Sequence, residues 1–324
     1  MLEAVLFLLQ ILIFPGFLFS LFLAFFYEWV DRKIYARLQN RVGPLYAGPH
    51  GVLQPIADFI KLLAKEDITP EAVDKSIFNI APILSLSLIF TAVTLLPMSG
   101  VSGLVSFEGD VILAMALMVL YVIVVFLAGF SSTNRFSIVG SERTVLQLLG
   151  YEIPLSLSVV SVALAAGTFS LAKIVQHQNI WFIFGPNIIS FAIFLIAGQA
   201  ELERIPFDIP EAEQEIVAGW LTEYSGKKLA LFRLSHDLEL LFVAGLATTL
   251  FWGGPGPIIP SLPSFLQAAF SIIFFVLKTT VVVFLLSTMR AVFARFRIDQ
   301  MVEFSWKYLI PLSFLQILLV RALI

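Results

Sequence analysis

The chain has 324 residues, of which 59% are hydrophobic and only 13% are charged, and its formal net charge is −3. It contains no cysteine and three histidines, which excludes thiolate-bound iron–sulfur clusters and cysteine-based zinc sites from this chain and argues against a haem-carrying bundle. A soluble protein could bury one or two long apolar segments, but this sequence has eight. We therefore expect an integral membrane protein.

The eight apolar segments follow one another along the chain, and most approach the ~20 residues that a helix needs to cross a bilayer. They lie at about 4–27, 77–97, 111–130, 150–168, 182–200, 238–252, 265–289 and 306–323. The sequence predicts an all-α membrane protein with about eight transmembrane helices, forming a single membrane domain over residues 1–324. The first segment lacks a basic residue before it and a small-residue cleavage site after it, so we expect a span rather than a cleaved signal peptide.

Basic residues are distributed unevenly between the two sides of the predicted membrane. If the N-terminus is external, seventeen of the twenty Lys and Arg fall in cytoplasmic connections, as the positive-inside rule requires. Lys173 and Arg321 are then external, and Lys278 lies within a span. An even number of spans predicts that both termini lie outside the plasma membrane and that the working loops are cytoplasmic.

The connection after the first span contains an amphipathic helix at about residues 49–66. Its apolar residues share one broad face, whereas Gln54, Asp58, Lys61 and Lys65 point elsewhere. A short helix divided in this way lies along the membrane surface rather than across it. Two roles remain open for it: a membrane anchor, or one wall of a cavity.

An acidic cytoplasmic loop at about 201–235 separates the fifth and sixth predicted spans. Seven carboxylates lie between Glu201 and Glu223, with Arg204 as the only cation among them. Two prolines predict an extended first half, and a helix can begin at Glu211. Bulky apolar residues alternate with the acids, so we expect partial burial, which raises carboxylate pKa values and couples their titration into a store of protons. The alternative is a solvated acidic loop with ordinary pKa values.

Ionisable residues also occur inside or at the ends of the predicted spans, where each costs kcal/mol of insertion free energy and therefore indicates function. They are Glu28, Glu152, His236, Asp237, Glu239 and Lys278. Glu28 and Asp237 could equally be end residues that reach the membrane surface. Lys278, midway through the seventh span, needs a carboxylate partner, and Glu239 and Glu152 are the candidates.

Three blocks of sequence resemble one known family. "AELERIPFDIPEAEQEIVAGWLTEYSG" (200–226) is similar to the signature of the quinone-pocket, H-type membrane subunit of complex I, which energy-converting membrane-bound hydrogenases share in divergent form. "DRKIYARLQNRVGPLYAGPHGVLQPIADFIKLLAKE" (31–66) agrees with it, and "GSERTVLQLLGYEIPL" (140–155) agrees more loosely. In that family the subunit joins the peripheral redox arm to the membrane arm through an acid-lined path.

Position in the chain and the resemblance together give the candidate site residues. The candidate proton-path residues are Glu28, Glu152, Glu201, Glu211, Glu213, Glu215, Glu223, His236, Asp237, Glu239 and Lys278. The candidate residues of the cytoplasmic pocket and docking mouth are Asp31, Arg32, Arg41, Gln54, Asp58, Arg143, Arg204, Phe207 and Asp208. No metal site is expected. The arginines could instead only clamp the loop or neutralise lipid headgroups.

The chain departs from the complex I pattern at two places. It has Asp31-Arg32-Lys33 where the complex I family typically reads "ERK", and His236 where a glutamate of "AEY" is expected. His236 could be a helix-end cap, and the path could run through Asp237 or Glu239 instead. These changes resemble the corresponding chain of archaeal membrane-bound [NiFe] hydrogenase and related sulfur-reducing complexes more than that of quinone reductases, and the resemblance implies ferredoxin as electron donor.

The resemblance implies a membrane-anchoring and coupling subunit of a redox-driven ion pump, with no redox centre of its own. The implied partners are a small subunit with [4Fe-4S] clusters, a large catalytic subunit with a [NiFe] or derived centre, antiporter-like and small membrane subunits, and the lipid bilayer, but no nucleic acid. An electron arriving near the acidic loop would shift its charge balance and move protons along the path.

Three other functions remain open. The first is the H-type chain of a quinone-reducing NADH dehydrogenase, which would need an apolar tunnel near Gln54, Asp58 and Phe207. The second is a stand-alone proton-coupled transporter, against which the lack of an internal repeat argues. The third is a scaffold whose acids only bind the cations of a partner.

Overall fold

A computed structural model describes residues 8–178, 185, 187–256 and 263–323 of the chain. All regular structure in these residues is helical, which confirms the predicted fold class. The helices are α2 (Phe17–Leu38), α3 (Gln54–Ala64), α4 (Lys75–Thr94), α5 (Asp110–Ser131), α6 (Arg135–Ala166), α7 (Leu171–His177), α9 (Ile188–Glu201), α10 (Glu213–Ile216), α11 (Gly226–Phe251), α12 (Ser264–Val292), α13 (Ile298–Phe304) and α14 (Ile310–Leu323). Short 3₁₀ turns η1 (Pro49–Gly51) and η2 (Gly219–Leu221) and a π turn, η3 (Ser305–Leu309), complete them.

Six stretches of helix are long and apolar enough to cross a membrane. They are Leu8–Leu38, Lys75–Thr94, Asp110–Ser131, Arg135–Ala166, Leu266–Val292 and Ile298–Leu323. The two other predicted spans overlap α9 and α11, so the count of eight stays a prediction. The beginnings of the first and fifth predicted spans lie partly outside the described residues.

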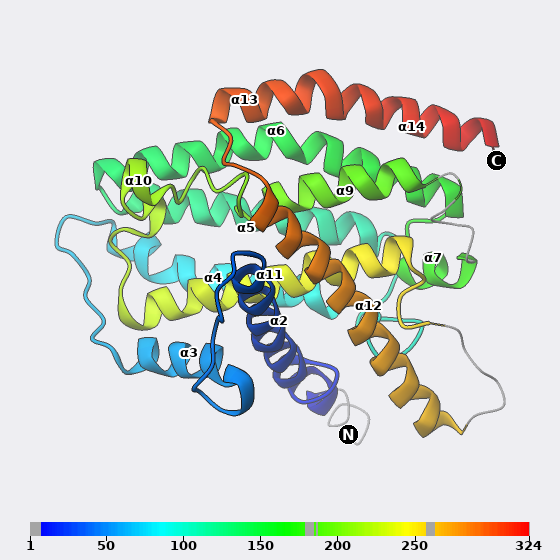
Figure 1. Cartoon of the computed structure of the whole chain (residues 1–324), viewed down its shortest axis with the longest axis horizontal. Helices are drawn as coiled ribbons and strands as arrows, with labels where there is room; N and C mark the ends of the chain where they lie inside the picture. Colours follow the sequence, from blue (N-terminus) through cyan, green and yellow to red (C-terminus); the bar gives the residue numbers. More distant parts are fainter. Residues whose placement is uncertain (1–7, 179–184, 186, 257–262, 324) are drawn as a thin grey trace.

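The helices are arranged in successive layers around α11 (Figure 1). The α13–α14 pair packs on α6, α6 packs on α9 and α5, and α5 packs on α4. The centre is α11, which contacts α4, α2, α12 and the short α3. From Leu238 to Phe251 every residue of α11 is buried. Because α11 faces protein rather than lipid, it can carry polar groups that a lipid-exposed helix could not.

Three spans extend further at one end than their apolar segments predict. α2 continues to Leu38, α6 begins at Arg135, and α11 begins at Gly226. At ~1.5 Å per residue, α6, which has 32 residues, is ~48 Å long, well beyond the ~30 Å hydrocarbon core. Hydropathy identifies only the part at lipid depth, and the polar ends of these helices come together where the acidic loop lies.

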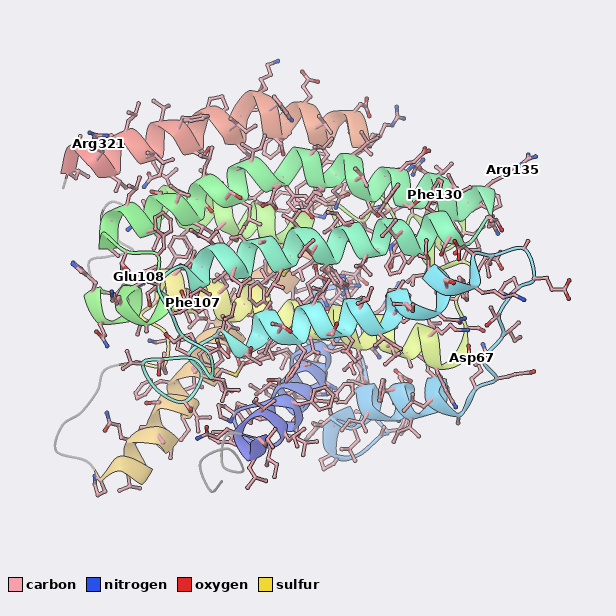
Figure 2. All side chains as sticks on the ribbon, turned by 180° about the vertical axis from the view of Figure 1, so that it is seen from behind. Asp67, Phe107, Glu108, Phe130, Arg135 and Arg321 are labelled. Atoms are coloured by element: carbon pink, nitrogen blue, oxygen red, sulfur yellow. The ribbon has the colours of Figure 1, made fainter. Side chains whose placement is uncertain are left out.

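The two ends of the bundle separate the connections as the sequence predicts. In Figure 2, Asp67 and Arg135 lie at one end of the long helices, and Glu108 and Arg321 lie at the opposite end. The acidic loop, α3 and the start of α11 share the end that carries Asp67, since Lys228 forms an ion pair with Asp67 (3.0 Å). That this end faces the cytoplasm stays a prediction.

Candidate functional site

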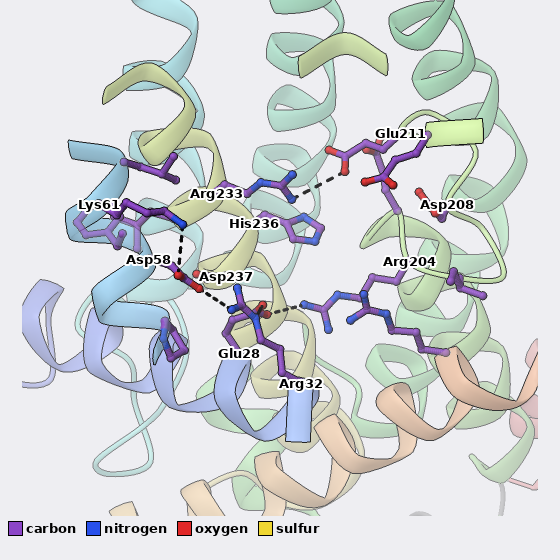
Figure 3. A pocket seen from close by; sticks show the side chains of 18 of the residues that line it. Glu28, Arg32, Asp58, Lys61, Arg204, Asp208, Glu211, Arg233, His236 and Asp237 are labelled. Carbon is purple, nitrogen blue, oxygen red and sulfur yellow. Dashed lines mark hydrogen bonds and ion pairs between the residues drawn. The ribbon is translucent and has the colours of Figure 1, made fainter. Parts of the chain in front are cut away.

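A cavity of about 570 Å³ lies where the acidic loop meets the ends of α2, α11 and α12 and one side of α3. Its carboxylates are Glu28, Asp58, Glu203, Asp208, Glu211, Glu213 and Asp237, and its cations are Arg32, Lys61, Arg204, Arg233, Arg290 and Arg295, with His236 beside them. Figure 3 shows these side chains converging from the four helices and the loop. Pro55, Phe59, Leu62, Ile205 and Leu234 supply apolar wall. The cavity therefore combines an apolar surface with many ionisable groups.

The amphipathic helix forms one wall of this cavity. Asp58, Phe59 and Leu62 line it, whereas Ile60 and Leu63 on other sides of α3 remain exposed. Asp58 accepts hydrogen bonds from Arg32 (2.8 Å) and Gln54 (3.1 Å). Of the two roles open from the sequence, the structure therefore gives α3 the cavity wall, while its exposed apolar side also suits a membrane surface.

The acidic loop folds back on itself instead of forming the helix expected from Glu211. Its only α-helix is the single turn α10, which begins at Glu213. The chain then turns at Gly219, which has a φ of +54°, and a Cβ there would lie 1.9 Å from the Pro210 carbonyl oxygen. Trp220 is buried directly after this turn. Packing of apolar loop residues into the bundle, rather than helix propensity, therefore decides the shape of the loop.

Buried ion pairs tie the first part of the loop to α2 and α12. Asp31 is fully buried and contacts Arg204 (3.0 Å) and Arg290 (2.5 Å), and it accepts a hydrogen bond from the Ser287 hydroxyl (2.6 Å). Arg204 also reaches Glu28 (3.3 Å), which binds Arg32 on its other side (2.6 Å). Figure 3 shows Arg204 and Arg32 on either side of Glu28. The predicted residues Glu28, Asp31, Arg32 and Arg204 thus form one charged cluster.

Three loop carboxylates have pKa values above their ordinary range. Burial, together with the negative charge of Glu211, raises the pKa of Glu203 to about 8, although the Trp220 indole donates a hydrogen bond to it (3.3 Å). Burial also raises the pKa of Glu211, despite Arg233 at 4.0 Å, and that of Asp208, despite its ion pair with Arg295. The loop therefore contains carboxylates that hold protons near neutral pH, which agrees with the expectation of a coupled proton store.

Carboxylates continue from the cavity into the bundle. His236, on the cavity wall, contacts Glu239 (Nδ1 to Oε2, 3.2 Å), which is 1% exposed. Glu201 is 2% exposed, interacts with Glu239 and Glu152, and neither of its oxygens has a hydrogen bond within usual limits. Glu152 accepts a hydrogen bond from the Ser156 hydroxyl (2.9 Å). The candidates on α11, α9 and α6 thus form a continuous series.

Five predicted residues lie away from the cavity lining. Arg143 pairs with the half-exposed Glu215 (2.6 Å) and reaches the Ile209 carbonyl (3.5 Å), so it clamps the outside of the loop. Glu223 accepts a hydrogen bond from Asn134 (2.5 Å). Arg41 is exposed, and Phe207 is buried against Phe296, with ring centroids 5.7 Å apart.

The predicted pairing of Lys278 with Glu239 or Glu152 is wrong. Its ammonium donates hydrogen bonds to the backbone carbonyls of Trp252 (2.6 Å) and Gly254 (2.9 Å) at the end of α11. Trp252 lies thirteen positions after Glu239, or ~20 Å along a helix. Carbonyls at the C-terminus of a helix have no intrahelical partner, so they can satisfy a lysine that has no carboxylate within reach.

The sequence interpretation left out several residues of the site. Glu203 was counted among the acids of the loop but not selected, and Arg290 and Arg295 were counted only as cytoplasmic cations. Their distance in sequence from the acidic loop concealed the contacts with Asp31 and Asp208. Among the residues that the structure describes, no group of three or more His, Asp or Glu side chains could hold a metal ion.

Comparison with known proteins identifies relatives over nearly the whole chain. The family model described as NADH dehydrogenase matches residues 9–321. The chain is 40% identical to the NADH-quinone oxidoreductase H chain of Brevibacillus brevis, covering 91% of this chain and 87% of that protein. It is 41% identical to the equally named protein of Protochlamydia amoebophila, covering 91% of each. It is 38% identical to a protein of Koribacter versatilis whose name adds only the number 2, covering 90% of this chain and 89% of that protein.

These matches confirm the resemblance to the complex I H-type superfamily. They favour the quinone-reducing alternative over the hydrogenase-type interpretation, since none of the three names mentions a hydrogenase or ferredoxin. The departures at Asp31 and His236 therefore do not indicate a change of enzyme class. The chain belongs to the NADH dehydrogenase family, in which it is an H-type membrane subunit of the complex I superfamily.

Proposed function

We propose that this chain is the membrane subunit that couples quinone reduction to proton movement in a complex I-type NADH-quinone oxidoreductase of the plasma membrane. The observation that carries the proposal is the cavity, because its ionisable lining continues without a break into buried carboxylates of three helices. The names of the relatives supply the reaction class.

The cavity has the properties that a quinone headgroup requires. Phe59, Leu62 and Leu234 give it apolar wall, and Asp58, Glu203 and His236 give it hydrogen-bonding groups. Reduction of a quinone to a quinol consumes two electrons and two protons. The electrons would come from an iron–sulfur cluster of a peripheral partner protein, since this chain has no cysteine. The protons would come from the acids of the cavity wall.

Removal of those protons would act on the interior carboxylates through their charge. Two unit charges ~7 Å apart at an effective dielectric constant of about 20 repel each other by ~2.4 kcal/mol. This corresponds to ~1.7 pKa units, which is enough to change the proton occupancy of a carboxylate that titrates near neutral pH. Glu201, Glu239 and Glu152 would pass this bias towards antiporter-like membrane partners.

Blocking the cavity tests the quinone assignment. In the purified complex, Leu62→Trp should raise the KM for a short-chain quinone at least tenfold, because the larger side chain enters the cavity. Ile60→Trp is the matched control on an exposed side of the same helix and should change the KM less than twofold. A photoreactive quinone analogue should label α3 or the loop, and excess quinone should prevent the labelling. Equal effects of the two tryptophans, with labelling elsewhere in the complex, would exclude the cavity as the quinone site.

A further inference from the structure

One buried side chain on α5 lies among the carboxylates but belongs to none of the motifs considered so far. Tyr121 is 5% exposed and sits near the middle of α5, in an otherwise apolar run. Its hydroxyl interacts by hydrogen bonding with the Glu239 carboxyl on α11. Other buried tyrosines of this chain contact backbone or hydroxyl groups: Tyr224 donates to the Ala128 carbonyl (3.3 Å), for example.

Carboxylates from the loop and from two helices surround the Tyr121 hydroxyl. Those that act on it most strongly are, in order, Glu239, Glu203, Glu211 and Glu201. Glu203 and Glu211 line the cavity, whereas Glu201 and Glu239 lie inside the bundle. Tyr121 therefore stands between the cavity acids and the interior acids.

The surroundings give this hydroxyl acceptors that have free capacity. Oε1 of Glu239 has no hydrogen-bond partner, and neither oxygen of Glu201 has one. The other oxygen of Glu239 faces His236 at 3.2 Å. Glu203 is held on the cavity side in a left-handed backbone conformation (φ 47°), which is unusual for a residue other than glycine and occurs most often at functional sites.

We propose that Tyr121 is a proton-relay residue that joins the cavity carboxylate Glu203 to the interior carboxylate Glu239. In one transfer the Tyr121 O–H bond breaks as a proton binds Glu239, and a proton leaving Glu203 restores the hydroxyl. One proton moves inward and no electron is transferred. A phenol serves here because it donates and accepts through the same oxygen, and a concerted transfer avoids a buried phenolate. This inference rests on the proposed function, in which Glu203 and Glu239 belong to one path.

Removal of the hydroxyl alone tests the relay in the assembled complex. Tyr121→Phe should lower coupled NADH–quinone turnover at least tenfold, in line with the ~10²–10⁴-fold typical of a lost proton-transfer group. The matched control is Tyr224→Phe, which also removes a buried hydroxyl with one hydrogen bond, and it should change turnover less than twofold. If both variants assemble and have the same turnover, the relay is refuted.

A second measurement separates the relay from a structural role and covers poor assembly of the phenylalanine variant. Incorporation of 3-fluorotyrosine at position 121 keeps the hydroxyl but makes it more acidic, so the pH profile of turnover should shift while assembly stays normal. An unchanged profile would contradict the relay. Wild-type complex without NADH–quinone activity would overturn the proposed function itself, whereas activity that is lost in Glu239→Gln but retained in Tyr121→Phe would overturn only the relay.

Discussion

The buried cluster around Asp31 allows a quantitative test of how the acidic loop is held. Asp31 is fully buried and shared by two arginines, Arg204, which is 6% exposed, and Arg290, which is 29% exposed. Replacement of Asp31 by Asn keeps the shape and the bond from the Ser287 hydroxyl but removes the negative charge. The two guanidinium groups then have less compensation in a poorly solvated place.

The expected cost of Asp31→Asn is about 3 kcal/mol of unfolding free energy. Removal of one partner of a buried ion pair typically costs ~3–5 kcal/mol. The lower end applies here because Glu28 still contacts Arg204 (3.3 Å) and because Arg290 can turn towards solvent. In a double-mutant cycle with Arg290→Gln, the coupling energy should be ~1.5–3 kcal/mol, the range for a hydrogen bond between charged groups.

The free energies can be measured by SDS titration of the chain in mixed micelles, with tryptophan fluorescence as the signal. Glu303→Gln provides the control, because its ion pair with Lys307 (3.4 Å) is exposed on both sides, and such pairs contribute about 0.5 kcal/mol or less. If Asp31→Asn costs no more than Glu303→Gln, or if the cycle gives no coupling, then this cluster does not hold the loop in place.

Three further outcomes follow from the structure. Because the pKa of Glu203 is raised from 4.5 to about 8, its protonated-carboxyl infrared band should be lost as pH rises through about 8; the stability that its neutral form contributes is complete below 4.5 and lost over that interval, and Glu203→Gln should remove both effects. Gly219→Ala, whose Cβ would lie 1.9 Å from the Pro210 carbonyl oxygen, should abolish quinone reduction but not electron transfer to an artificial acceptor, whereas Gly100→Ala, with no atom within 4 Å, should reduce neither. Lys278→Met should leave the ratio of protons to electrons unchanged while lowering the thermal stability of the complex, because it removes hydrogen bonds to carbonyls at the end of α11; a lower ratio would return Lys278 to the proton path.

The helices were predictable because lipid imposes a strong constraint on composition. Every predicted apolar segment overlaps a helix, since runs near 20 apolar residues have few other uses. The polar extensions of α6 and α11 were not predictable from hydropathy. Their first turns are stabilised by contacts with distant parts of the chain, such as that of Arg143 with Glu215 and that of Lys228 with Asp67.

The site was predictable in its residue types and less so in its pairings. Density of acids and the family resemblance pointed to Glu201, Glu239 and Asp58, which the structure brings to the cavity or just behind it. The partner of Lys278 was predicted wrongly because a charge pattern cannot reveal that backbone carbonyls are the nearest acceptors. The position of Tyr121 was missed because an aromatic residue in an apolar helix normally indicates core packing.

The central claim is that buried carboxylates carry protons in response to quinone chemistry, and Glu201 tests it most directly. The measurement is the number of protons translocated per electron by the purified complex in liposomes, compared among wild type, Glu201→Gln and Glu142→Gln, the last being an exposed acid on α6. Coupled proton transport should fall at least tenfold in Glu201→Gln, with assembly and electron transfer to an artificial acceptor preserved, and should be unchanged in Glu142→Gln. Wild-type stoichiometry and rate in Glu201→Gln would contradict the account.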